Sequence, residues 1–248
     1  MNESLSGKAA LVTGGARRLG AAIARRLHAA GANVLLHYRD SESDAAKLEA
    51  ELNALRPKSA SKVKAELLAP IAPRALVGAA RDSFGRLDLL VNNASSFFPV
   101  DVGAIEASHW EELIGSNLRA PLFISQEAAP ELAKHQGSIV NIVDIHAERP
   151  LKGYPIYSIA KAGLAALTRS LAIELAPRVR VNGVAPGAIA WPEDGQFDPA
   201  ERERIIATTP LARIGSPEDI AQAVHFLACA PYITGQIIAV DGGRSIYL

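Results

Sequence analysis

Three side chains with acid–base chemistry lie close together in the sequence, between Asp144 and Lys161. Tyr157 and Lys161 are four residues apart, so on a helix both side chains share one face. An ammonium beside a phenol favours the tyrosinate, and we expect Lys161 to make Tyr157 a proton relay near neutral pH. Asp144 precedes Tyr157 by 13 positions, and an ionised carboxylate can only accept hydrogen bonds. At a reaction site such a carboxylate would repel a developing oxyanion, so Asp144 would suit a substrate with N–H donors better than a simple ketone.

The scaffold that must position these residues is indicated by short apolar runs that alternate with stretches of helical spacing. We predict strands over residues 8–13, 34–38, 61–67, 87–92, 138–143, 179–184 and 237–240. We predict helices over residues 19–30, 43–55, 74–84, 108–134, 157–175 and 219–228. Unbroken apolar strands between helices are typical of a parallel sheet covered on both faces. The predicted fold is therefore α/β, a single Rossmann-type doubly wound parallel sheet with helices on both faces, and one domain over residues 1–248.

The composition is that of an ordinary soluble globular protein, with 49% apolar and 21% charged residues. Lys plus Arg equals Asp plus Glu at 26 each, so the charge balance suggests neither a nucleic-acid nor a membrane partner. The single cysteine, Cys229, lies in an apolar helical run, where we expect a core residue rather than a nucleophile. The chain has no run of 18 apolar residues and begins with a polar segment, so we expect a cytoplasmic protein.

A glycine-rich turn, Thr-Gly-Gly-Ala-Arg-Arg-Leu-Gly at residues 13–20, joins the first predicted strand to the first predicted helix. Glycine in such a turn lets the backbone approach a pyrophosphate, which then rests on the free N–H groups of the helix N-terminus. The predicted cofactor contacts in this turn are Gly14, Arg17, Arg18, Leu19 and Gly20. The guanidinium of Arg18 could reach the phosphates and the edge of a substrate together.

The tip of the second predicted strand, His37-Tyr38-Arg39, bears on the choice of dinucleotide. An acidic residue there suits the ribose hydroxyls of NAD, whereas a nearby arginine accommodates the 2′-phosphate of NADP. Arg39 lies at the tip and Arg17 lies across the glycine turn, so the sequence favours NADP(H). We expect Asp40, one residue later, to cap the following helix.

The glycine turn and the tip of the second strand resemble motifs of the short-chain dehydrogenase/reductases. The resemblance extends over almost the whole chain, through Asn92-Asn93-Ala94, the segment from Asn141 to Lys161 and the terminal Asp241-Gly-Gly. The resemblance implies further cofactor contacts at Glu66, Leu67, Asn93, Ala94, Ser95, Tyr157, Lys161, Pro186 and Gly187. It also implies that Asn117 continues the proton relay through water and that the chain forms a homotetramer. We assign no residue to a metal site.

Four residues depart from the commoner family pattern and resemble the pteridine reductases, namely Arg18, Ser95, Phe97 and Asp144. In this interpretation Phe97 stacks on a flat heterocycle, while Ser95 and Arg18 bind its opposite edges. Tyr157 with Asp144 handles the proton of a ring nitrogen. Trp191 either closes the pocket over the substrate tail or lies at the surface or in an interface. The predicted function is NADPH-dependent reduction of a pterin, a dihydropterin or dihydrofolate.

Two other functions stay open at this point. The first is a general carbonyl reductase of the same family, acting for example on 3-oxoacyl thioesters, which Asp144 and Phe97 disfavour. The second is a non-catalytic NADP(H)-binding sensor, which the intact Asn117, Tyr157 and Lys161 disfavour. Turnover with a defined substrate separates all of these functions.

The interval 187–208 breaks the alternation of strands and helices, with Pro192, Gly195 and Pro199 in it. We predict a long irregular segment there, of the kind that forms a binding loop or a surface insertion.

Overall fold

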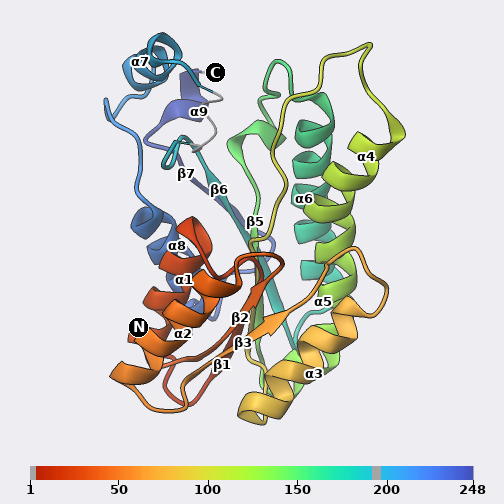
Figure 1. Ribbon diagram of the computed structural model, residues 1–248, viewed down its shortest axis with the longest axis vertical. Coiled ribbons are helices and arrows are strands. Elements are labelled where there is room, and N and C mark those ends of the chain that lie inside the picture. Colours follow the sequence, from red (N-terminus) through yellow and green to blue (C-terminus); the bar gives the residue numbers. More distant parts are fainter. Residues whose placement is uncertain (1–3, 192–196, 248) are drawn as a thin grey trace.

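The chain folds around one parallel sheet, seen in the computed structural model, which describes residues 4–191 and 197–247 (Figure 1). Within these residues, seven strands pair in the order β3-β2-β1-β4-β5-β6-β7, and every pair is parallel. They are β1 Ala9–Val12, β2 Asn33–Tyr38, β3 Ala60–Lys64, β4 Leu89–Asn92, β5 Ser138–Ile142, β6 Arg180–Pro186 and β7 Ile237–Val240. The predicted doubly wound α/β fold is confirmed.

Helices cover both faces of this sheet, as its apolar strands require. One face, on the left in Figure 1, is covered by α1 Arg18–Ala29, α2 Glu42–Leu55 and α8 Pro217–Cys229. The other is covered by α3 Ala72–Phe84, α4 Ala107–Ile114, α5 Ala120–Lys134 and α6 Pro155–Glu174. The short elements η1 Gly115–Arg119 and η2 Ile145–Ala147, with α7 Pro199–Ala207 and α9 Arg244–Tyr247, complete the chain. Over residues 4–191 and 197–247, none of the helices combines the length and apolar character needed to cross a bilayer.

The strand order reverses at β1, which pairs with β2 on one side and with β4 on the other. Ligands of open parallel sheets bind outside the carboxyl ends of the strands at such a point. Gly14 follows β1 and Asn93 follows β4. The topology therefore brings the glycine turn and the Asn93 turn together at one edge of the sheet.

The helix predicted over residues 108–134 is interrupted by η1, five residues with π-helical hydrogen bonding. Pro121 explains the interruption, because it has no N–H to give to the carbonyl of Asn117 four residues earlier. The N–H of Ala120 instead donates to the carbonyl of Gly115, five residues before it. Spacing rules assume a constant 3.6 residues per turn, so they predicted one uniform helix.

The prediction of an irregular segment over 187–208 was wrong in its second half, which forms α7. Asp198 caps this helix, since its Oδ1 accepts the N–H of Glu201 at 2.8 Å, and Pro199 occupies its first turn. A capping residue followed by proline is a helix start signal, and it was overlooked. Residues 192–196, with Pro192 and Gly195, lie outside the described residues.

Gly20 gives a test of how tightly α1 packs on the glycine turn. A Cβ at this position would lie 2.0 Å from the carbonyl oxygen of Gly14 and 2.8 Å from Nδ2 of Asn93. We expect Gly20→Ala to lower the free energy of unfolding in urea by about 1–3 kcal/mol, because backbone must move. Gly78→Ala in α3 is the control, since its Cβ meets nothing within 4 Å. The control should keep or gain stability, by about 0.4–1 kcal/mol. Equal stability of the two variants would contradict the packing argument.

Candidate active site

A cavity of about 640 Å³ opens along the carboxyl edge of the sheet. Every predicted site residue except Asn117 lines it: Gly14, Arg17, Arg18, Leu19, Gly20, His37, Tyr38, Arg39, Glu66, Leu67, Asn93, Ala94, Ser95, Phe97, Asp144, Tyr157, Lys161, Pro186, Gly187 and Trp191. The residues predicted for the cofactor and those predicted for the substrate therefore share one continuous space.

The Thr13 hydroxyl joins the two turns at the centre of this edge. Its Oγ1 accepts the backbone N–H of Asn93 at 2.9 Å and that of Ala94 at 3.0 Å. The same hydroxyl donates to the carbonyl of Val91 at 3.3 Å. Nδ2 of Asn93 donates back to the carbonyls of Thr13 at 2.8 Å and Gly14 at 3.1 Å. Asn93 thus holds the glycine turn in place, besides lining the cavity.

His37 supports the glycine turn from the end of β2. Nδ1 of His37 accepts the N–H of Gly14 at 3.0 Å, so the proton lies on Nε2, which is 3.1 Å from the carbonyl oxygen of Ala65. The ring is 2% exposed, and burial lowers the pKa of His37. A neutral imidazole therefore holds the turn through one accepted and one donated hydrogen bond.

The start of α1 fits the pyrophosphate of a dinucleotide. Arg17 is its N-cap, in extended conformation, and makes no side-chain capping hydrogen bond. The first turn of α1 contains no acidic residue, so the positive end of the helix dipole faces the cavity unopposed. Gly14 has φ of 60°, and a Cβ there would lie 3.1 Å from Cα of Ala94. The absence of side chains leaves room for phosphate oxygens at the free N–H groups.

Arg17 and Arg39 both stand at the end of the cavity beyond β2, with side chains 61% and 54% exposed. The prediction that Asp40 caps α2 was wrong. Oδ2 of Asp40 accepts a hydrogen bond from Nε of Arg39 at 2.8 Å, and Ser41 is the N-cap. A charge-assisted partner next to it outcompetes the neutral N–H groups of the helix. This hydrogen bond is the main reason that the pKa of Arg39 is raised.

Asp144, Tyr157 and Lys161 meet at the middle of the cavity. The Tyr157 hydroxyl donates to Oδ2 of Asp144 at 2.7 Å. Oδ1 of Asp144 accepts the N–H of His146 at 2.8 Å and caps η2, which fixes the carboxylate. Nζ of Lys161 donates to the carbonyl of Ile142 at 2.9 Å, 5.6 Å from the centre of the Tyr157 ring. Tyr157 and Lys161 are 5% and 3% exposed, so both polar groups are shielded from solvent.

The expectation that Lys161 makes Tyr157 readily ionised was wrong for the protein alone. Burial, and then the charge and hydrogen bond of Asp144, raise the pKa of Tyr157 well above its ordinary value. Burial lowers the pKa of Lys161 to about 8, against the opposing effect of Asp144. The sequence indicates an effect of Asp144 on a substrate but does not indicate its effect on Tyr157, which depends on the distance between the two side chains. The phenol is therefore a protonated donor at neutral pH.

Asn117 lies behind the cavity, in η1, with 0% of its surface exposed. Its Nδ2 donates to the carbonyls of Ser96 at 2.9 Å and Leu113 at 3.0 Å. Its Oδ1 is buried and has no hydrogen-bond partner among the residues that the structure describes. An unpartnered buried oxygen is the kind of group that an internal water satisfies. This geometry agrees with the predicted relay through water, which stays a prediction.

The rings expected to contact a substrate already have protein partners. Phe97 stacks on Tyr154, with centroids 4.6 Å apart, and meets Tyr157 edge-on at 4.8 Å. Trp191 packs against Phe197 at 5.9 Å. Nη2 of Arg18 donates to the carbonyls of Ala190 at 3.1 Å and Trp191 at 3.3 Å. Arg18 thus fastens the segment after β6 to the start of α1, a contact that the sequence did not suggest.

Several residues that line the cavity were not singled out from the sequence, among them Ser96, Glu112, Ser116, His146, Leu151, Arg204 and Arg244. Ser96 had a signal, since it stands between Ser95 and Phe97 in the same turn. Glu112 and Ser116 had no such signal in the sequence, because they line the cavity only as a result of how α4 and η1 pack beside the edge of the sheet.

Comparison with known proteins identifies the family. A family profile described as enoyl-(acyl carrier protein) reductase matches residues 14–245. The chain belongs to the short-chain dehydrogenase/reductases. Pteridine reductase 1 of Leishmania tarentolae is 42% identical to it, over 99% of both chains. A putative ketoacyl reductase of the granaticin polyketide synthase of Streptomyces violaceoruber is 38% identical over 96% of both. The 3-oxoacyl-(acyl carrier protein) reductase of Staphylococcus aureus is 35% identical, over 95% of this chain and 97% of its own.

The predicted family is confirmed, and the short-chain dehydrogenase/reductase described here is an oxidoreductase that uses a nicotinamide dinucleotide. The relatives differ in the substrates that their names give. Family membership therefore establishes the reaction class, while the substrate must be inferred from the residues of the cavity.

Tyr157→Phe tests the proton donor by removing only a hydroxyl. We expect turnover to fall about 10²–10⁴-fold with any substrate that the wild type reduces, which is the usual worth of general acid–base help. Binding of the nicotinamide cofactor, measured by fluorescence titration, should be nearly unchanged. Lys161, a predicted cofactor contact, keeps its hydrogen bond to Ile142 and therefore its position in the cavity. Tyr232→Phe is the control, since Tyr232 is fully exposed. Turnover of Tyr157→Phe within a few-fold of wild type would remove this residue from the mechanism.

Proposed function

We propose that this protein is an NADPH-dependent reductase of a pterin, a dihydropterin or dihydrofolate. The observation that carries the proposal is the hydrogen bond from the Tyr157 hydroxyl to Asp144 at 2.7 Å, inside the cavity. A carboxylate at this position cannot donate to a ketone oxygen, but it can accept an N–H. The 42% identity to a protein named pteridine reductase 1 supports the same substrate class.

The proposed chemistry is reduction of a ring C=N bond. When bound, the nicotinamide supplies a hydride to the ring carbon and is oxidised. The electron pair of the C=N bond passes to the nitrogen, which takes the proton of the Tyr157 hydroxyl. New C–H and N–H bonds form, and Asp144 holds the phenol and accepts an N–H of the substrate. Lys161 remains charged below its pKa of about 8 and limits the cost of the negative charge left on Tyr157.

NADPH rather than NADH is proposed because two arginines, Arg17 and Arg39, line the adenosine end of the cavity. Glu66, another predicted cofactor contact, lines the cavity 4.0 Å from Nε of Arg39. A guanidinium binds phosphate oxygens in charge-assisted hydrogen bonds, each worth roughly 1.5–3 kcal/mol. In this proposal wild-type protein binds NADPH well over tenfold more tightly than NADH.

The substrate ring is proposed to lie beside Phe97, with Ser95 and Arg18 toward its polar edges. All three residues line the same cavity as the Tyr157–Asp144 pair, and the ring of Phe97 meets that of Tyr157 at 4.8 Å. Phe97 is held by Tyr154 in a stacked arrangement only 12° from parallel, so its orientation is set before a ligand binds. Trp191, with Phe197 beside it, is proposed to cover the substrate tail.

A ketoacyl reductase is the second candidate, supported by two relatives whose names state that activity. Asp144 disfavours it, because the position would need a hydroxyl donor for the developing oxyanion. A sensor without turnover is the third candidate.

A homotetramer is proposed for the assembly. Large apolar side chains stand exposed on α5 and α6, with Phe123 at 44%, Ile159 at 52% and Ile173 at 78%. Apolar residues on two long helices of one face are suited to packing against other subunits.

Oxidation of NADPH with dihydrobiopterin, dihydrofolate and an acetoacetyl thioester separates the three candidates. We expect turnover with at least one of the two bicyclic heterocycles, and much weaker turnover with the thioester. Preference for the thioester would establish the ketoacyl reductase, and no turnover with any of them would favour the sensor.

Asp144→Ser tests the observation on which the proposal rests. The serine can still cap η2, so we expect a folded protein that binds NADPH. Most activity with dihydrobiopterin should be lost, because serine brings neither a charge nor a fixed acceptor for the Tyr157 hydroxyl. Weak activity with simple ketones can appear, since a hydroxyl donor now faces the oxyanion. Unchanged kcat and KM with dihydrobiopterin would make Asp144 a bystander and remove the main support for a pterin substrate.

A further inference from the structure

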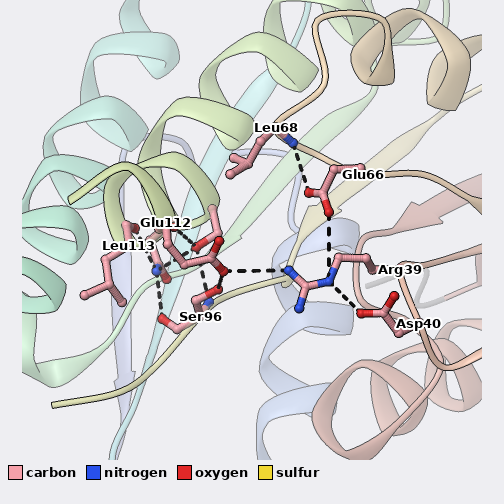
Figure 2. Close-up of polar contacts among 9 residues, drawn as sticks. Arg39, Asp40, Glu66, Leu68, Ser96, Glu112 and Leu113 are labelled. Atoms are coloured by element: carbon pink, nitrogen blue, oxygen red, sulfur yellow. Dashed lines mark hydrogen bonds and ion pairs between the residues drawn. The ribbon is translucent and has the colours of Figure 1, made fainter. Parts of the chain in front are cut away.

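Arg39 is surrounded by three carboxylates that come from three parts of the chain (Figure 2). Its Nε lies 2.8 Å from Oδ2 of Asp40 and 4.0 Å from Oε2 of Glu66, and its Nη1 lies 3.7 Å from Oε1 of Glu112. Asp40 and Glu66 follow β2 and β3, whereas Glu112 belongs to α4 on the far side of the cavity. The contact with Glu112 therefore joins Arg39, at the predicted cofactor end of the cavity, to α4 on the opposite side.

The same oxygen of Glu112 has a second partner. Oε1 also accepts a hydrogen bond from Oγ of Ser96, drawn in Figure 2. Ser96 stands between Ser95 and Phe97, in the turn that lines the substrate end. A single carboxylate oxygen thus connects the guanidinium at the cofactor end to the turn at the substrate end.

The Ser96 turn is tied to η1 as well. The N–H of Ser96 donates to Oγ of Ser116 at 3.3 Å, and its carbonyl accepts from Nδ2 of Asn117 at 2.9 Å. Oγ of Ser116 in turn donates to the backbone carbonyl of Glu112 at 2.7 Å. Ser96 is therefore held at its hydroxyl, its N–H and its carbonyl, and only the hydroxyl contact leads on to Arg39.

We propose that Glu112 is a positioning residue that links Arg39 to the Ser96 turn, and that its carboxylate competes with the 2′-phosphate of NADPH for Arg39. The proposal rests on the proposed use of NADPH and concerns a residue outside the motifs that read the dinucleotide. A phosphate on Arg39 must approach the Glu112 carboxylate, and two like charges at about 4 Å repel appreciably even in water. NADH carries a neutral hydroxyl at this place and meets no such repulsion.

Glu112→Gln is the test, because glutamine removes the charge and keeps an oxygen that can accept from Ser96. We expect Kd for NADPH, measured by fluorescence titration without substrate, to fall about 3- to 10-fold. Kd for NADH and KM for the reducible substrate should change less than twofold. Glu111→Gln is the matched control, since it makes the same charge change one residue away on an exposed side chain. The control should leave both dinucleotide affinities unchanged.

Two further variants separate this role from a general effect on structure. In an Arg39→Leu background, Glu112→Gln should no longer lower Kd for NADPH, because the guanidinium for which the carboxylate and the phosphate compete is then absent. Glu112→Ala removes the acceptor too, so it should also raise KM for the substrate, by about 2- to 10-fold, as the Ser96 turn loosens. The substrate is whichever compound of the turnover assay the wild type reduces, so failure of the pterin assignment leaves this test intact.

The outcomes of these titrations are distinct. If wild type binds NADH as tightly as NADPH, the proposed cofactor is wrong. If NADPH is preferred but Glu112→Gln and Glu111→Gln give the same Kd for it, the proposed competition is overturned. Tightening of NADPH that persists in the Arg39→Leu background would overturn it as well, because the effect would then not pass through Arg39.

Discussion

The Thr13 hydroxyl joins the turn after β1 to the turn after β4, and the whole cavity depends on that junction. One oxygen accepts two backbone N–H groups of the second turn and donates to the strand that leads into it. These two strands are neighbours only because the order of the sheet reverses at β1. Asn93 returns hydrogen bonds to the first turn, and His37 braces it from the other side. A site for a long two-part ligand is thereby built from segments about 80 residues apart in the chain.

Around this junction, burial sets the protonation of the reacting groups. Burial alone would favour the neutral forms of both Tyr157 and Lys161, which raises the pKa of the first and lowers that of the second. The charge of Asp144 acts in one direction on both, since it favours the proton on each. At neutral pH the tyrosine and lysine therefore hold their protons beside a carboxylate. Such a site is prepared to give a proton, as a reductase must when hydride has arrived on the neighbouring atom.

The fold and about half of the residues that line the cavity could be predicted from the sequence, because both follow from local patterns. The sheet is visible as apolar runs, and residues such as Gly14, Asn93 and Gly187 come within two residues of strand ends, which meet at one edge. What could not be predicted depends on distances across the fold. Glu112 gives no local signal, and the raised pKa of Tyr157 depends first on how deeply the ring is buried and then on how close Asp144 lies to its hydroxyl.

The π-helical turn between α4 and α5 has a consequence for how this protein tolerates changes in length. Each residue of an α-helix turns by about 100°, so the wider turn in η1 shifts the angular phase of α4 relative to α5. With that shift, Glu112 faces the cavity while Ile124 and Ala128 of α5 face the core. In a continuous α-helix of the same sequence, either Glu112 would face the cavity or Ile124 and Ala128 would face the core, but not both. Insertion or deletion of a single residue in this segment would therefore act at a distance, by turning one helix against its neighbours. The surface loops can vary in length without such an effect.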